Sequence, residues 1–187
     1  MKVSFKKFVS MALAVVTTFA LTATAFAADY YAEPVFPTST PSTSVTTSEM
    51  SSAISSSSDV ATVEVKSERS IYVGASVMKK LAKSGKSLVI KSDDATITID
   101  GSSITNVKKI NLSMKIVNTA NKTTIRMKSK SDLGCEAKIV VTTCKMSAEK
   151  LAKAHVYCDG EDLGPVELNE DGYPVITVTK GGTYTIK

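Results

Sequence analysis

The fold is indicated by one stretch of this sequence, Ser87-Leu88-Val89-Ile90-Lys91-Ser92-Asp93-Asp94-Ala95-Thr96-Ile97-Thr98-Ile99-Asp100. β-Branched residues are enriched on both sides of the Asp-Asp pair, and apolar residues recur at every second position, as in half-buried strands. Aspartates tolerate the backbone conformations that a tight turn requires. The stretch therefore predicts a β-hairpin made of residues 87–91 and 95–100.

The same pattern continues through most of the chain. Further strands are predicted at 60–65, 109–116, 123–128, 136–143, 155–158, 166–168, 173–179 and 183–186. Asp-Gly and Gly-Gly pairs separate several of them, as hairpin turns do. Closely spaced strands joined by turns predict an all-β fold, an antiparallel β-sandwich of the immunoglobulin-like or a similar type.

Two short helices interrupt the strands. Residues 76–83 place Val77 and Leu81 one turn apart, begin at a serine that can cap a helix, and precede Gly85, a favoured residue beyond a helix end. Residues 147–153 repeat this arrangement. We expect the first helix to close one end of the sandwich.

The N-terminal residues predict export. Three lysines among the first seven residues precede an apolar run at 8–23, and Ala25-Phe26-Ala27 matches a signal peptidase site. We expect residues 1–27 to be a signal peptide and the protein to be secreted and extracellular, with a cell-wall association and no membrane span after cleavage. An uncleaved membrane-spanning helix is the alternative.

A linker and one domain follow the predicted signal. Fifteen of the twenty-five residues at 34–58 are Ser or Thr. Such a composition buries little apolar surface, so residues 28–58 are predicted to be a disordered spacer, with glycosylation left open. Residues 59–187 are long enough for one β-sandwich domain. Their three cysteines allow at most one disulfide, in which Cys158 could take part, or three free thiols.

Charge is unevenly distributed over this domain. Residues 59–157 hold eighteen basic and nine acidic residues, whereas 158–187 hold two and six. A basic surface attracts anionic partners, and outside a bacterial cell these include anionic cell-wall polymers such as teichoic acid. Export argues against nucleic acid. The candidate basic face consists of Lys79, Lys80, Lys83, Lys86, Lys108 and Lys109; a soluble basic surface without a partner is the alternative.

Motifs that could carry chemistry are incomplete. Ser76 and Lys79 have the Ser-x-x-Lys spacing of penicillin-recognising enzymes, a spacing that a chain rich in both residues produces by chance. His155 and Cys158 are too few for a zinc site. A further segment has four residues at EF-hand spacing but Val178 at the twelfth position, so a hairpin turn is predicted there; the four are Glu167, Asn169, Asp171 and Gly172. We expect no enzyme activity, metal or cofactor.

Aromatic residues are scarce. Trp is absent, and residues 59–187 contain four tyrosines and no Phe. A flat platform for crystalline polysaccharide needs several exposed rings, so none is expected. A smaller cleft for a soluble glycan stays open, with Tyr157 and Tyr173 as its contacts.

Residues 71–187 resemble a known group of modules. The segments that carry the likeness are 83–88, 96–101, 109–113, 154–157, 163–166, 170–173 and 182–186. Their pattern of turns and apolar positions is similar to β-sandwich accessory modules in secreted cell-surface and cellulosome-associated proteins of Gram-positive gut anaerobes. The resemblance implies a location more than an activity.

These observations predict a secreted, non-catalytic accessory or adhesion module at the bacterial cell surface. Its expected partner is an anionic wall polymer, with an extracellular glycan or a surface protein as other possibilities. A soluble-glycan-binding module is the first alternative. A hydrolase that uses Ser76 and Lys79 is the second.

Overall fold

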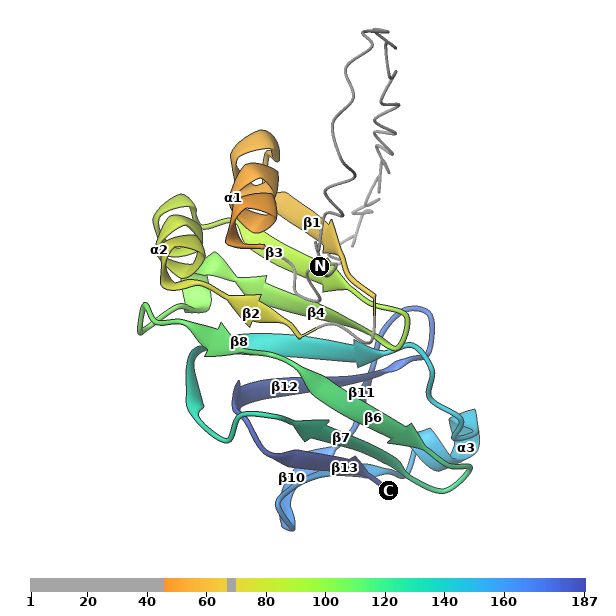
Figure 1. Cartoon of the computed structure of the whole chain (residues 1–187). Helices are drawn as coiled ribbons and strands as arrows, with labels where there is room; N and C mark the ends of the chain where they lie inside the picture. The colour runs from red at the N-terminus through yellow and green to blue at the C-terminus, as the bar shows by residue number, and fades with distance from the viewer. Residues whose placement is uncertain (1–45, 67–69) are drawn as a thin grey trace, which may run out of the picture. The chain divides into compact units, whose positions relative to one another are not determined.

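The computed structural model describes residues 46–66 and 70–187, which belong to one compact unit, Ser39–Lys187. This unit is mostly β, with three sheets and a few short helices, and it has the sandwich-like all-β character that the sequence predicts (Figure 1). The predicted signal peptide, 1–27, and residues 28–45 of the predicted linker lie outside the described residues.

The largest sheet has six strands. Their order across the sheet is β1 (Val60–Glu64), β3 (Ser87–Lys91), β4 (Ala95–Asp100), β8 (Asp132–Val141), β12 (Pro174–Lys180) and β11 (Glu167–Leu168). The hairpin predicted from 87–100 is confirmed, because β3 and β4 pair antiparallel with Leu88 opposite Ile99 and Ile90 opposite Ile97.

The prediction of a purely antiparallel sandwich is wrong at one edge, where β1 pairs with β3 in parallel. Parallel neighbours cannot be joined by a tight turn and need a crossover segment. In this chain the crossover contains a short strand, β2 (Tyr72–Val73), and the helix α2 (Ala75–Ser84). Local alternation of residues does not reveal this connection, because it is the same for parallel and antiparallel edges.

The other two sheets are smaller. The second has the order β10 (Glu161–Pro165), β9 (His155–Cys158), β13 (Thr183–Ile186), β7 (Thr123–Met127) and β6 (Met114–Asn118), all antiparallel. The third pairs β2 with β5 (Ile110–Asn111). The single strand predicted at 109–116 is therefore two strands in different sheets.

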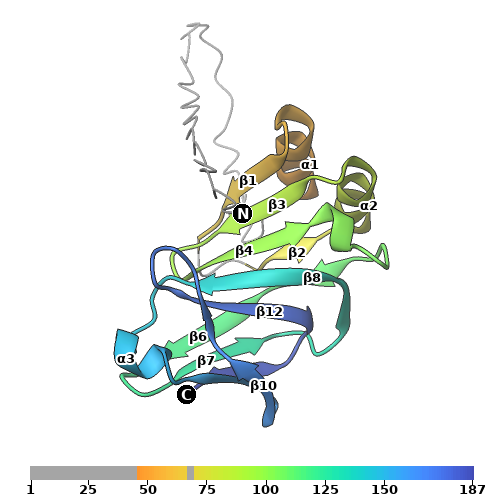
Figure 2. The same cartoon turned by 180° about the vertical axis from the view of Figure 1, so that it is seen from behind.

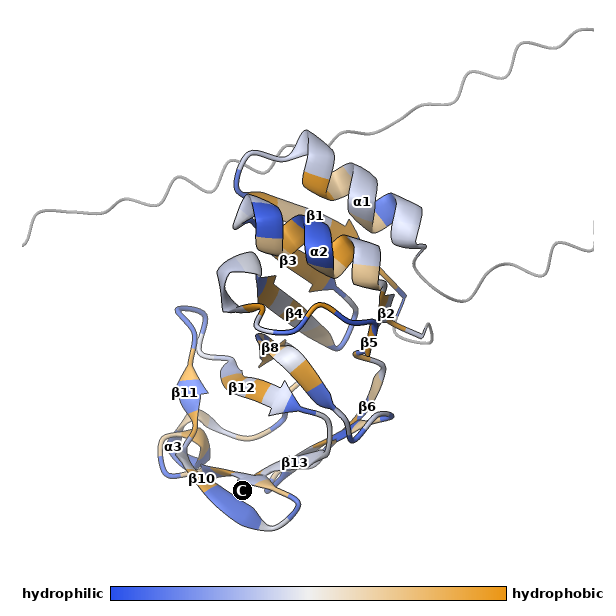
Figure 3. Cartoon of the chain, turned by 90° about the vertical axis from the view of Figure 1, so that its left-hand side faces the viewer, coloured by the Kyte–Doolittle hydropathy of each residue, from blue (hydrophilic) through white to orange (hydrophobic). Residues whose placement is uncertain are grey.

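The core lies against one face of the six-stranded sheet. Inward side chains alternate along its strands, as a period of two requires; Leu88, Ile97, Ile139 and Ile176 are 2% exposed or less. Helices α1 and α2 and the β2–β5 pair cover the β1–β3–β4 part of this face (Figures 1 and 3). The opposite face, turned toward the viewer in Figure 2, is covered by none of the helices that the structure describes.

The sequence predicts disorder throughout residues 28–58, but Thr47–Ser56 form helix α1, which is a correction. A capping box starts the helix: Thr46 accepts a hydrogen bond from the Glu49 amide, and the Glu49 carboxylate accepts one from the Thr46 amide. Met50 and Ile54, one turn apart, are 0% and 1% exposed. Composition averaged over the segment hides this apolar pair among the serines.

Helix α2 begins one residue earlier than predicted. Its N-cap is Gly74, so Ser76 lies inside the first turn and is not the capping residue. Gly85 adopts a left-handed conformation, φ 64°, beyond the last turn, as predicted. The second predicted helix is the single turn α3 (Ala148–Leu151), which follows Ser147.

Docking of α1 is testable by removing its apolar contact. Ile54→Ala is expected to lower the free energy of unfolding by about 2–5 kcal/mol, because a buried aliphatic side chain leaves a cavity. Ser52→Ala, at an exposed position of the same helix, should stay within about 0.5 kcal/mol of the wild type. Urea unfolding of the full chain measures both. Equal stabilities of Ile54→Ala and the wild type would contradict a docked α1.

Candidate functional site

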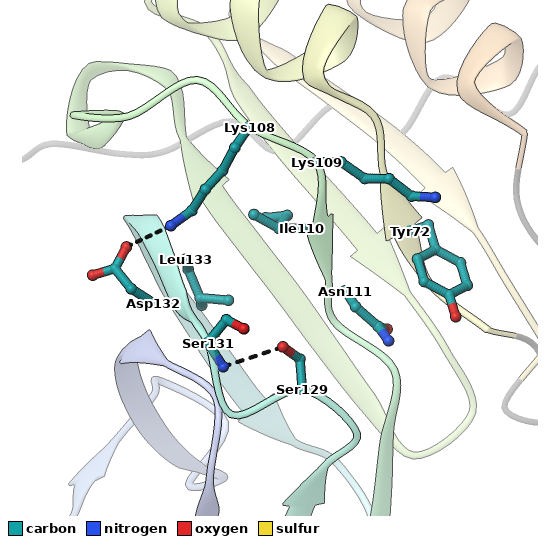
Figure 4. A pocket seen from close by; sticks show the side chains of 9 residues that line it. All are labelled: Tyr72, Lys108, Lys109, Ile110, Asn111, Ser129, Ser131, Asp132 and Leu133. Atoms are coloured by element: carbon teal, nitrogen blue, oxygen red, sulfur yellow. Dashed lines mark hydrogen bonds and ion pairs between the residues drawn. The ribbon is translucent and has the colours of Figure 1, made fainter.

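A pocket of about 450 Å³ lies between the β2–β5 pair and the start of β8 (Figure 4). Three stretches that are distant in sequence form it: β2, the residues from 108 to β5, and the β7–β8 connection with the start of β8. Its lining side chains are Tyr72, Lys108, Lys109, Ile110, Asn111, Ser129, Ser131, Asp132 and Leu133. Two of these, Lys108 and Lys109, belong to the basic face predicted from the sequence.

Asp132 links the segment before β5 to the start of β8, which form one side of the pocket. Its Oδ1 accepts a hydrogen bond from the Lys108 ammonium at 2.9 Å and another from the Gly134 amide at 2.6 Å. The first bond joins the segment before β5 to β8. The second is local and fixes the carboxylate relative to the β8 backbone.

Gly134 strengthens the same attachment. Its carbonyl accepts hydrogen bonds from the amides of Thr105 and Asn106 at 2.9 and 3.0 Å. Its φ of 68° favours glycine, and an added Cβ would lie 2.6 Å from the Asn106 carbonyl oxygen. The 105–108 segment therefore rests directly on the β8 backbone, where a larger residue than glycine would not fit.

The opposite wall is formed by a short pair of strands. Tyr72 and Asn111 are directly opposite in the β2–β5 register. The Lys109 ammonium lies 4.8 Å from the centroid of the Tyr72 ring, a cation–π contact that holds this exposed lysine at the pocket (Figure 4). Tyr72 is 37% exposed, so part of its surface remains open to solvent.

The two serines are positioned by a close backbone approach. The Ser129 hydroxyl accepts a hydrogen bond from the Ser131 amide, and the Ser131 carbonyl accepts one from Gly181. A Cβ on Gly181 would lie 1.8 Å from the Ser129 carbonyl oxygen. Only glycine therefore allows the β12–β13 connection to support this side of the pocket.

The electrostatics of the pocket combine both signs of charge. Lys108 and Lys109 are cationic, and Asp132 is anionic. The hydrogen bond from Lys108, together with that from the Gly134 amide, lowers the pKa of Asp132 below its usual range, so its carboxylate is charged at neutral pH. With the Asn111 amide and the serine hydroxyls, this set can bind a charged, hydroxyl-rich group.

The four remaining lysines of the predicted basic face divide into two pairs. Lys80 donates hydrogen bonds to the Ser51 carbonyl and the Ser55 hydroxyl, and Lys86 donates to the carbonyls of Ile54 and Ser57. These two therefore hold α1 and are not free ligand contacts, a correction to the predicted face. Lys79 and Lys83 are exposed on α2.

The predicted glycan contacts lie in different parts of the fold. Tyr157 is on β9, with the Lys187 ammonium 4.4 Å from its ring centroid. Tyr173 precedes β12, and its amide donates to the Asn169 side chain. Among the pocket linings described for residues 46–66 and 70–187, none includes either tyrosine. The two tyrosine rings therefore do not line a common cleft among these pockets.

The other candidate motifs lie outside this pocket. Ser76 and Lys79 are both exposed on α2, outside the pocket of Figure 4. The predicted hairpin turn at Asn169–Gly172 is confirmed between β11 and β12. His155 pairs with Asp162 at 2.9 Å and with no thiol. Within the described ranges, no three His, Cys, Asp or Glu residues are grouped as a metal site requires.

The cysteines are free in the structure. Cys135 and Cys158 are buried and Cys144 is partly exposed. Burial raises the pKa of Cys135 to about 11, so its thiol is protonated at neutral pH and a poor nucleophile. Cys144 lies beyond the end of β8, in contact with the Thr123 hydroxyl.

Sequence reasoning missed five polar residues of the pocket: Tyr72, Asn111, Ser129, Ser131 and Asp132. A signal for Asp132 was available in Asp132-Leu133-Gly134, where an aspartate can accept from the amide two residues later. No comparable local signal marks Tyr72 and Asn111, because a two-residue pairing brings them together.

The Asp132 carboxylate should make folding stability depend on pH. Because its folded pKa lies below the usual 3.8, the unfolded chain takes up the proton first as pH falls. The stabilising contribution is then complete above about pH 5 and disappears below the folded pKa. The difference in unfolding free energy between wild type and Asp132→Asn should therefore be largest at pH 7 and decrease below about pH 4.

Urea unfolding at several pH values measures this difference. Ser131→Ala removes a neighbouring hydroxyl that does not titrate in this pH range. The difference in unfolding free energy between this variant and the wild type should therefore not follow the same pH course. A constant difference for Asp132→Asn from pH 7 to pH 2.5 would contradict the assigned carboxylate contacts.

Comparisons with protein-family models, curated proteins and solved structures found no match to this chain. Among the described residues, no helix has the length and apolar character needed to span a membrane. The function of the chain is therefore inferred from its own residues.

Proposed function

We propose that this chain is a secreted, non-catalytic accessory or adhesion module that binds an anionic cell-wall polymer. The observation that carries the proposal is the pocket between β5 and β8, where Lys108 and Lys109 lie beside an amide, two hydroxyls and a tyrosine ring. A wall polymer of the teichoic acid class offers phosphates to the ammonium groups and polyol hydroxyls to the polar side chains.

The position of the lysines gives this pocket a specific role. Lys109 is exposed and its ammonium is held against the Tyr72 ring, so part of the entropy of ordering this side chain is lost before a ligand binds. Lys79 and Lys83 are exposed on α2, on the same side of the six-stranded sheet as β2 and β5 (Figure 3). They extend the positive surface and attract a long polyanion from solution.

The N-terminal residues support a location outside the cell. The predicted signal peptide, 1–27, implies export, and the Ser/Thr-rich residues that follow would separate the module from whatever precedes it. The resemblance to cell-surface accessory modules agrees with this location. The fold is all-β and sandwich-like. That the sandwich is of the immunoglobulin-like type is a further part of this proposal.

Soluble-glycan binding has weaker support. Tyr157 is exposed only in part, and its ring already makes a cation–π contact with the Lys187 ammonium. Tyr173 lies elsewhere, in a hairpin of the six-stranded sheet. A hydrolase also has weaker support, because Ser76 and Lys79 lie on an exposed helix surface. Both remain as outcomes of the binding experiment.

Binding to walls tests the proposal directly. The full chain should co-sediment with Gram-positive cell walls that contain teichoic acid, and binding should decrease as salt rises, because exposed charge pairs are screened. Walls stripped of teichoic acid should bind less. Salt-resistant binding to a polysaccharide would favour the glycan alternative, and absence of binding to intact walls would rule out the proposed partner.

A matched pair of double variants locates the binding site. Lys108→Gln with Lys109→Gln should weaken wall binding by about three- to tenfold, because Lys109 loses its charge contact and the loss of Lys108 leaves the Asp132 carboxylate unpaired beside the polyanion. Lys79→Gln with Lys83→Gln removes the same charge from α2 and should have a smaller effect. Equal losses would assign binding to the whole basic surface instead of the pocket. Urea unfolding of each variant checks that it remains folded.

A further inference from the structure

The pocket contains a carboxylate as well as its lysines, and this carboxylate is fixed in place. Asp132 Oδ1 receives both hydrogen bonds, from Lys108 and from the Gly134 amide. Among residues 46–66 and 70–187, Oδ2 has no hydrogen-bonding partner, and the Asp132 side chain is 70% exposed. The backbone bond keeps this negative charge at the pocket even if a ligand draws Lys108 away.

A fixed carboxylate discriminates between anionic ligands. A purely anionic group that approaches Lys108 also approaches Asp132, and the like charges repel. A ligand that carries an ammonium near its phosphate meets attraction at both places. Lys109 remains for the phosphate, because its contact is with an aromatic face rather than with a carboxylate.

We propose that the pocket recognises a phosphate ester that also bears an ammonium group, with Asp132 as the residue that determines this specificity. Lys109, Asn111 and Ser131 receive the phosphate, and Asp132 Oδ2 receives the ammonium. This inference rests on the proposed function and narrows its ligand class. Two sources share the chemistry: a wall polymer esterified with amino acids, and a lipid headgroup such as phosphoethanolamine.

N-acetylation of the ligand separates this recognition from simple charge attraction. The probe is poly(glycerol phosphate) with alanyl esters, compared with the same polymer after its amines are acetylated. Acetylation leaves every phosphate in place and makes the polymer more negative. Attraction to a basic surface predicts tighter binding of the acetylated polymer, whereas recognition by Asp132 predicts weaker binding, by about threefold for one exposed charge contact.

The chain offers a matched control for Asp132. Asp162-Leu163-Gly164 repeats the sequence Asp132-Leu133-Gly134, and Asp162 Oδ1 likewise accepts from the glycine amide two residues later, at 2.8 Å. Asp162 pairs with His155 on the β9–β10 hairpin and does not line the pocket. In both variants, Asp132→Asn and Asp162→Asn, an amide oxygen can still accept from the glycine while the charge is lost.

The expected result is a preference of the full wild-type chain for the polymer with free amines, measured by titration calorimetry. Asp162→Asn should keep that preference, and Asp132→Asn should lose it and bind the acetylated polymer at least as tightly. Vesicles with phosphatidylethanolamine, compared with vesicles of the N-acetylated lipid, form the second arm. The same preference there would identify the lipid headgroup as the source of the ligand.

Two different failures remain distinguishable. If the wild type binds both polymers and prefers the acetylated one, or if Asp132→Asn keeps the wild-type preference, this inference is wrong while wall-polymer binding stands. If the wild type binds neither polymer nor either vesicle, nor unesterified poly(glycerol phosphate), the proposed function fails and the inference with it. Circular dichroism of both aspartate variants confirms that any loss does not come from unfolding.

Discussion

The two hydrogen bonds that Asp132 Oδ1 accepts define the candidate site. One comes from the amide of Gly134, two residues further along the same strand, and the other from Lys108, which precedes β5. Together with the Gly134 carbonyl, which accepts from Thr105 and Asn106, they attach a long connection to the start of β8. This attachment fixes Lys108 relative to the start of β8. The pocket exists because this connection is held against the strand.

The lysines of the chain show why charge patterns alone do not identify a binding surface. Lys86 donates to the carbonyls of Ile54 and Ser57 at the C-terminal end of α1, where a positive charge also interacts favourably with the helix dipole, and Lys80 donates to the Ser51 carbonyl in the middle of the same helix. Lys108 is paired with an aspartate, and Lys109 rests on an aromatic ring. Lysines that are neighbours in the sequence thus differ in role: Lys80 holds a helix, whereas the adjacent Lys79 is exposed to solvent. Their partners decide the role.

The strongest sequence predictions concern elements whose pattern is local. The β3–β4 hairpin follows from alternation around a pair of aspartates, and Gly85 ends α2 in the conformation that glycine favours. Helix α1 is different, because serines give it weak intrinsic propensity, and tertiary contacts dock it through the buried Met50 and Ile54 and through hydrogen bonds from Lys80 and Lys86. The repeated Asp-Leu-Gly motif forms the same aspartate-to-amide bond twice, at Asp132 and Asp162, yet only the first lines the pocket.

The sequence by itself determined the mostly β character of the domain, its main turns and an excess of basic residues, because alternation, glycine position and charge are properties of neighbouring residues. Tertiary structure decided the parallel β1–β3 edge, the docking of α1 and the assembly of the pocket. Tyr72, Asn111 and Asp132 meet there through strand pairing and through the Lys108 bond between distant segments. Such contacts depend on how the whole chain closes on its core, and no short stretch of sequence contains that information.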